Sequence, residues 1–104
     1  MMPPTPHKIF VGNNLRLAID ALGLTQAEFS RRTKIAPSKL HNYLRGDNYP
    51  DLFWLAQVCE QFGLTTDWFL RGIRAGVAAG VAENLPPAAP GQPLASQLRI
   101  IDAL

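Results

Sequence analysis

Cysteine and histidine are scarce in this 104-residue sequence, which contains one cysteine, Cys59, and two histidines, His7 and His41. A single thiol cannot form an internal disulfide, and these three residues are a poor ligand set for a structural zinc ion. The sequence also lacks an apolar run of roughly 18–20 residues, as a transmembrane helix requires, and a signal peptide at its proline-containing start. We therefore expect a cytoplasmic protein with no metal or cofactor and no contact with a membrane.

Catalytic motifs are missing as well. The sequence has neither a glycine-rich phosphate-binding loop nor a nucleophile motif. Its acidic residues are dispersed into positions that we interpret as helix caps and turns, among them Asp20, Glu28, Asp47 and Asp51. The sequence does not predict an enzyme.

Acidic residues are absent from one informative window, residues 31–45. Five of the ten lysines and arginines lie there, while the net charge of the whole chain is only +2. They are Arg31, Arg32, Lys34, Lys39 and Arg45. A cluster of one sign attracts a polyanion such as DNA, although it is also compatible with a solvated helix surface.

Apolar spacing predicts helices and no strands. We expect helices over residues 13–22, 25–33, 37–45 and 51–62, and a shorter fifth helix from Thr65 or Thr66. Thr25 and Glu28 form a capping-box pattern, and Pro37 suits a first helical position. Gly23, Gly46 and Gly63 stand where helices end.

The apolar stripes predict which side chains form the core. In the third helix these are Leu40, Tyr43 and Leu44, and in the fifth helix Trp68. The fourth helix carries a stripe of Leu52, Leu55, Ala56, Cys59 and Phe62. Cys59 is therefore interpreted as a buried structural thiol, and Trp54, which lies off the stripe, as partly exposed.

Composition divides the chain into three parts. Residues 1–10 are expected to be a flexible leader and residues 11–74 the folded domain. Residues 75–104 are rich in Ala, Gly and Pro, with a proline-stiffened linker over 86–93 and a short amphipathic tail over 94–104.

Residues 13–72 resemble the Xre/Cro-type helix-turn-helix domains of phage and bacterial repressors. The resemblance lies in LGLTQAEFSRRT (22–33), IAPSKLHNYLRG (35–46) and FGLTTDWFLRG (62–72). It implies an all-α, five-helix, repressor-like domain without a sheet, followed here by the Pro/Ala-rich tail. It also implies a bacterial or phage-encoded, nucleoid-associated protein.

The resemblance also implies roles for individual residues. The helix over 37–45 would lie in the major groove as the recognition helix. Base-reading positions on it are Ser38, Lys39, His41 and Asn42, and DNA phosphates would be contacted by Gln26, Arg31, Arg45 and Asn48. The sequence departs from the family pattern at three positions: Pro37 replaces a common polar base contact, Lys34 replaces a turn glycine and so predicts positive φ, and Leu44 replaces a common glutamate.

Taken together, these features predict a transcriptional regulator, most simply a repressor, that binds double-stranded DNA as a homodimer. The family often uses the surface around the fifth helix for dimer contacts, where Trp54 or Phe69 would be candidates. A second interpretation is a protein-binding adaptor or antitoxin with the same fold, whose docking segment is the tail at 94–104.

Overall fold

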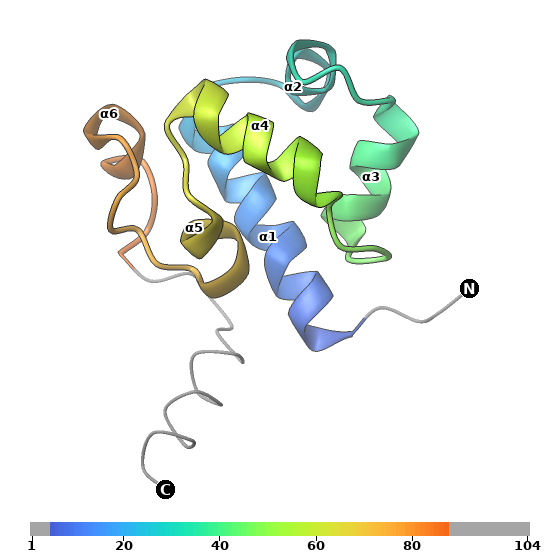
Figure 1. The fold of residues 1–104 in the computed structure, drawn as a ribbon, viewed down its shortest axis with the longest axis horizontal. Helices are drawn as coiled ribbons and strands as arrows, with labels where there is room; N and C mark the ends of the chain where they lie inside the picture. The colour runs from blue at the N-terminus through green and yellow to red at the C-terminus, as the bar shows by residue number, and fades with distance from the viewer. Residues whose placement is uncertain (1–4, 88–104) are drawn as a thin grey trace, which may run out of the picture.

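The computed structural model describes residues 5–87, which form six α-helices and no strand (Figure 1). The helices are α1 (Pro6–Ala21), α2 (Gln26–Arg32), α3 (Pro37–Arg45), α4 (Leu52–Phe62), α5 (Thr66–Arg71) and α6 (Ala79–Ala82). The all-α prediction is confirmed, and α6 is an addition to the five expected helices. No helix in this part of the chain is long and apolar enough to cross a membrane.

The first helix begins seven residues earlier than the apolar spacing indicated. The Thr5 hydroxyl accepts a hydrogen bond from the backbone N–H of Lys8 at 3.2 Å, and Pro6 occupies the first turn. This cap and proline start the helix, so that Phe10 and Val11 are buried. The expected flexible leader over 1–10 is therefore wrong for residues 6–10, while residues 1–4 lie outside the described part.

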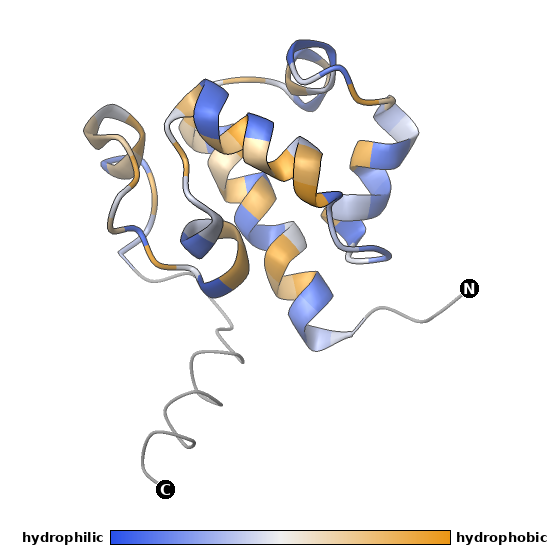
Figure 2. Ribbon diagram, viewed as in Figure 1, coloured by the Kyte–Doolittle hydropathy of each residue, from blue (hydrophilic) through white to orange (hydrophobic). Residues whose placement is uncertain are grey.

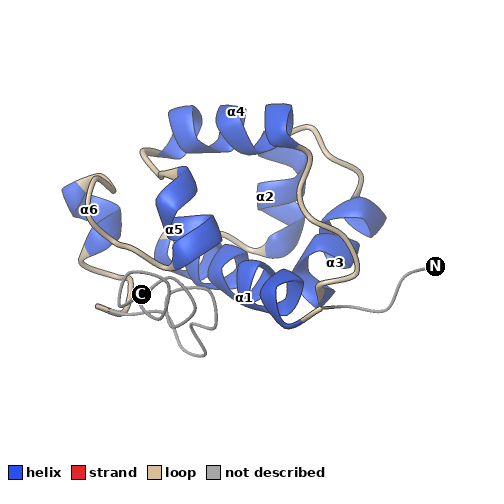
Figure 3. Cartoon of the chain, turned by 60° about the horizontal axis from the view of Figure 1, so that its bottom comes forward, coloured by secondary structure: helices blue, strands red, loops and turns tan. Residues whose placement is uncertain are grey.

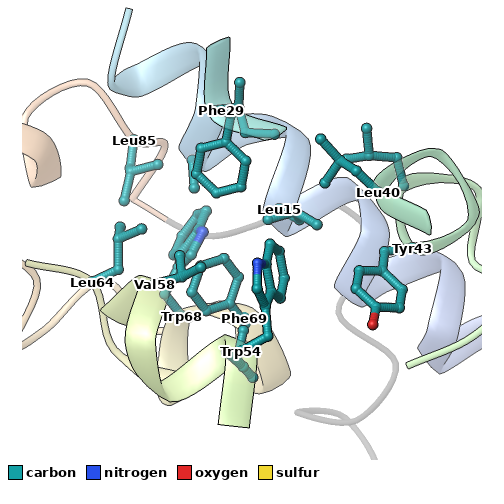
Figure 4. Close-up of a cluster of buried hydrophobic side chains, with 14 of the residues drawn as sticks. Leu15, Phe29, Leu40, Tyr43, Trp54, Val58, Leu64, Trp68, Phe69 and Leu85 are labelled. Carbon is teal, nitrogen blue, oxygen red and sulfur yellow. The ribbon is translucent and has the colours of Figure 1, made fainter. Parts of the chain in front are cut away.

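The helices enclose a single core. α1 and α4 run along opposite sides of the described chain, with α2 and α5 between them (Figure 3). Large buried side chains from all of these helices meet there, among them Leu15, Phe29, Leu55, Val58 and Trp68, many of which are visible in Figure 4. α3 and α5 pack directly on α1, whereas α2 packs on α3 and α4 on α5.

Two hydrogen bonds fix α5 on α1. The Trp68 indole Nε1–H donates to the backbone carbonyl of Asn14 at 2.9 Å, and the Asn14 side-chain amide donates to the carbonyl of Phe69 at 3.1 Å. All three residues are fully buried. The expected core role of Trp68 is confirmed, and it includes a polar contact that apolar spacing does not reveal.

α4 presents a different face to the core from the predicted one. Trp54, Leu55 and Val58 are buried, whereas Leu52 and Ala56 are exposed. The Trp54 ring packs edge-on against Phe29, with ring centroids 6.0 Å apart. The predicted stripe and the buried residues both recur with helical spacing. The core contains the set with Trp54, whose side chain is larger than that of Leu52. The predictions for Leu52, Ala56 and Trp54 are therefore wrong.

Cys59 occupies the edge of this buried face. It is half-buried rather than fully buried, and its removal from water raises the pKa of the thiol. A raised pKa keeps the sulfur protonated and unreactive near neutral pH. This agrees with a structural role and leaves the thiol partly accessible.

The segment after α5 also contributes to the core. Val77 and Leu85 are buried, and the backbone N–H of Ala78 donates to the carbonyl of Gly63 at 2.8 Å. Packing therefore continues well beyond residue 74, the expected end of the domain. The tail predicted over 94–104 lies outside the described residues.

Candidate nucleic-acid interface

α2 begins with the predicted capping box. The backbone N–H of Glu28 donates to the Thr25 hydroxyl, and the Glu28 carboxylate accepts from the backbone N–H of Thr25, both at 3.1 Å. The hydrogen bond from the Thr25 backbone N–H, and after it the Thr25 side chain, lower the pKa of the Glu28 carboxyl. This cap fixes Gln26 as the first, exposed residue of α2.

The turn between α2 and α3 is closed by short hydrogen bonds. The Ser30 hydroxyl donates to the carbonyl of Ile35 at 2.6 Å, and the backbone N–H of Ile35 donates back to the carbonyl of Ser30 at 3.1 Å. Lys34 has the predicted positive φ, at 56°. Pro37 then opens α3 as predicted.

α3 separates cleanly into two faces. Leu40, Tyr43 and Leu44 are buried against the domain. Because a helix turns by about 100° per residue, the spacing of Ser38, Asn42 and Arg45 places them together on the opposite face. Ser38, His41 and Arg45 are exposed and Asn42 is half-buried. Ser38, Asn42 and Arg45 therefore present hydrogen-bonding groups away from the core.

Lys39 lies apart from this outward face. It lines a cavity of about 340 Å³ between the helix-turn-helix and the start of α4, together with Lys34, Tyr43 and Trp54. Sequence position alone grouped it with Ser38 and Asn42. Its place on the flank of α3 instead suits a contact with a phosphate, because a long cationic side chain extends to the rim of a groove.

The four candidate phosphate ligands lie around the ends of α2 and α3. Gln26, Arg31, Arg45 and Asn48 are all exposed. Arg45 is not free, because its guanidinium lies 2.7 Å from the carboxylate of Asp47. Arg32 neighbours α4, and its backbone carbonyl accepts a hydrogen bond from Gln61 at 3.2 Å. Arg32, which the sequence did not select as a phosphate ligand, thus lies beside α4.

The loop after α3 is fixed by contacts that sequence analysis did not predict. Gly46 has φ of +81°, and a Cβ atom there would come within 2.8 Å of the Cα atom of Ile9. The Tyr43 hydroxyl accepts from the backbone N–H of Asp51 at 3.2 Å. His7 contacts Tyr49 in the same loop. In the sequence, only the hydrogen-bonding side chain of His7 could have indicated this contact. His7 lies in the segment expected to be a flexible leader, so it was not considered.

Comparison with known proteins agrees with this geometry. Neither curated proteins nor solved structures gave a match. A protein-family model described as a helix-turn-helix domain matches residues 12–74, which is more than half of the chain and spans α2, the turn and α3. Domains of this family are DNA-binding regulatory domains and are not typically enzymes. The chain belongs to the family of Xre-like helix-turn-helix domains.

Proposed function

We propose that this chain is a sequence-specific regulator of transcription that binds double-stranded DNA as a homodimer and acts as a repressor. The observation that carries the proposal is the outward face of α3, where Ser38, Asn42 and Arg45 share one side of a helix backed by core residues. A major groove accommodates one α-helix, and this face supplies the donors and acceptors that read base edges.

Individual roles follow from chemistry and position. Asn42 forms paired hydrogen bonds with adenine, and Ser38 and His41 contact neighbouring base edges. Gln26, Arg31, Arg45 and Asn48 bind phosphates on either side of the groove, joined by Lys39 from the flank. Residues 31–45 contain no acidic side chain that would repel DNA. Binding alone is sufficient to repress, because a bound protein excludes other proteins from the same DNA.

Selection from randomised duplex DNA tests the proposal. The purified chain should enrich a roughly palindromic motif at about 150 mM salt, with half-sites about 34 Å apart, and its affinity should fall linearly on a log–log plot against salt. A pool that stays random at this salt, with only weak binding that disappears as salt rises, would refute specific recognition. The adaptor interpretation would then be favoured, and its docking segment, residues 94–104, would be the first target.

A further inference from the structure

A cleft lies where the turn between α2 and α3 faces α4. Its first part is the cavity of about 340 Å³ that Lys39 lines. A second cavity of about 320 Å³ adjoins it, because Thr33, Lys34 and Gln57 line both. We call the two cavities together the turn cleft. Sites for small molecules span roughly 300–1,000 Å³, so the turn cleft has room for an organic ligand.

Positive charge predominates in the lining of the turn cleft. Lys34 and Lys39 line the first cavity, and Arg32 joins Lys34 in the second. Among the described residues of this lining, Asp51 is the only acid, and its carboxylate caps α4 by accepting from the backbone N–H of Trp54 at 3.0 Å. The turn cleft therefore favours an anion.

The walls beside these cations are apolar and aromatic. Ile35 and Ala36 line the first cavity from the turn, and Tyr43 and Trp54 line it from α3 and α4, with ring centroids 5.4 Å apart. Figure 2 shows hydrophobic and hydrophilic colours next to each other along the turn and along α4. Such mixed walls are typical of sites for small organic molecules, whereas a DNA phosphate gains nothing from them. The lining thus suits an anion with an apolar body.

One hydrogen-bonding group of this wall has no partner. Trp54 is 7% exposed, too little for the dimer contact that the sequence suggested, and its Nε1–H is buried without a hydrogen bond to any described residue. Buried N–H groups are normally paired, because an unpaired one is costly. An acceptor on a ligand in the turn cleft is a partner that the described chain does not provide.

The backbone at Lys34 also indicates a function for its side chain. Its φ of 56° is a conformation that residues other than glycine adopt rarely. Glycine would adopt it without strain, so a lysine here lowers stability. The Lys34 ammonium forms no ion pair with the described residues that would compensate. Strain of this kind gathers at functional sites.

We infer that the turn cleft binds a small organic dianion, a dicarboxylate with an apolar body. Its carboxylates pair with Lys34 and Lys39, and its body lies against Tyr43 and Trp54. Binding itself does not involve DNA. The consequence for DNA rests on the proposed function: the ligand neutralises Lys39, which otherwise contacts a phosphate, and so weakens DNA binding. The turn cleft is thereby the effector site of the regulator.

Titration of the full-length protein with phthalate, isophthalate and terephthalate at constant ionic strength tests the site. These three dicarboxylates share an apolar ring and differ in the spacing of their charges. The NMR signal of the Trp54 indole N–H should shift saturably with at least one of them. The signal of Trp68, whose indole is bonded to Asn14, should stay in place. The dimethyl ester of the same isomer, and inorganic phosphate, should bind at least about tenfold more weakly, since each lacks either the charges or the ring.

Three variants separate the site from folding and from general charge. Lys34→Gly relieves the positive φ, so it should melt at or above the temperature of the wild type and still bind the dicarboxylate about tenfold or more weakly. Lys39→Gln should weaken binding to a similar degree. Lys8→Gln removes the same charge from α1, outside the turn cleft, and should match the wild type.

Absence of a saturable shift with all three dicarboxylates would overturn the inference, as would equal losses in Lys39→Gln and Lys8→Gln. Tighter binding of inorganic phosphate than of any dicarboxylate would also overturn it and would assign the turn cleft to a DNA phosphate. The dicarboxylate that binds should lower affinity for a selected duplex at constant ionic strength, and unchanged affinity would refute the effector role. Failure of DNA selection would refute the proposed function alone, because ligand binding is measured on the free protein.

Discussion

His7 and Tyr49, forty-two residues apart in the chain, are joined by a hydrogen bond of 2.7 Å between the His7 ring Nδ1 and the Tyr49 hydroxyl. The other ring nitrogen, Nε2, lies 2.8 Å from the backbone carbonyl of Leu70 at the end of α5. Because a carbonyl only accepts, Nε2 carries a hydrogen and donates it to Leu70. One side chain thus connects α1, α5 and the loop that follows the recognition helix.

Removing the Tyr49 hydroxyl should loosen this loop. The Tyr49→Phe variant keeps the ring, which also lies 5.5 Å from the Lys8 ammonium, and loses only the bond to His7. We expect a stability loss of about 0.5–1.5 kcal/mol in urea denaturation. Affinity for the selected duplex should also fall, with unchanged base preference, because Asn48 is next to Tyr49. Unchanged affinity and stability in Tyr49→Phe would show that the bond does not hold the loop.

Replacing Asn42 with alanine should remove discrimination at one base pair. The expected cost on the selected duplex is about 1–3 kcal/mol, with little change on a duplex in which that base pair is altered. Gln61→Ala, which removes a carboxamide from α4, is the matched control and should retain specificity. Lys39→Ala should weaken binding to both duplexes about equally, since Lys39 lies on the flank of α3. Equal losses on both duplexes for Asn42→Ala would contradict its base-reading role.

Neutralising Asp47 should strengthen DNA binding. Its carboxylate pairs with Arg45 at 2.7 Å and so withholds a cation from the phosphates. We expect Asp47→Asn to raise affinity and to steepen the salt dependence by about one phosphate contact. Asp67→Asn makes the same charge change on α5, where the carboxylate lies 3.6 Å from Arg71. If both variants gain DNA affinity equally, the change in net charge explains the gain, and release of Arg45 does not.

Gly12 should be intolerant of a side chain because of its place in the helix packing. A Cβ atom there would come within 2.6 Å of the Leu44 carbonyl oxygen and 2.7 Å of that of Tyr43, so α3 rests on the backbone of α1. Gly12→Ala should cost about 1–3 kcal/mol of stability and displace α3. Gly80→Ala, in α6 with nothing within 4 Å of the new atom, should instead be neutral or stabilise by up to about 1 kcal/mol. Thermal unfolding compares the two, and equal melting temperatures would refute the packing argument.

Acid should abolish the contribution of the α2 capping box. The pKa of Glu28 is lowered in the folded state by its hydrogen bonds with Thr25, so folding favours the charged carboxylate. The resulting stabilisation is present at neutral pH and is lost as pH falls through the lowered pKa. Glu28→Gln should therefore melt below the wild type at neutral pH, and the two curves should converge in acid. A difference that persists unchanged at low pH would show that the charge is not responsible.

Interactions between residues close together in the chain could be predicted from the sequence by itself. The capping box at Thr25 and Glu28, proline at the start of α3 and the positive φ of Lys34 all follow from interactions among residues close together in the chain. The same holds for the inward face of α3, where Leu40, Tyr43 and Leu44 are the only large apolar residues. Local signals of this kind were enough to identify the helix-turn-helix and the family.

Contacts between distant residues were decided only by the tertiary structure. In α4, two apolar stripes compete, and the core takes Trp54, whose ring packs against those of Phe29 and Tyr43, while Leu52 stays exposed. The bond from His7 to Tyr49 and the position of Lys39 on the flank depend in the same way on how the helices meet. Sequence spacing fixes the face on which a side chain lies, but packing decides which face is turned to the core and which remains available to DNA or to a second copy.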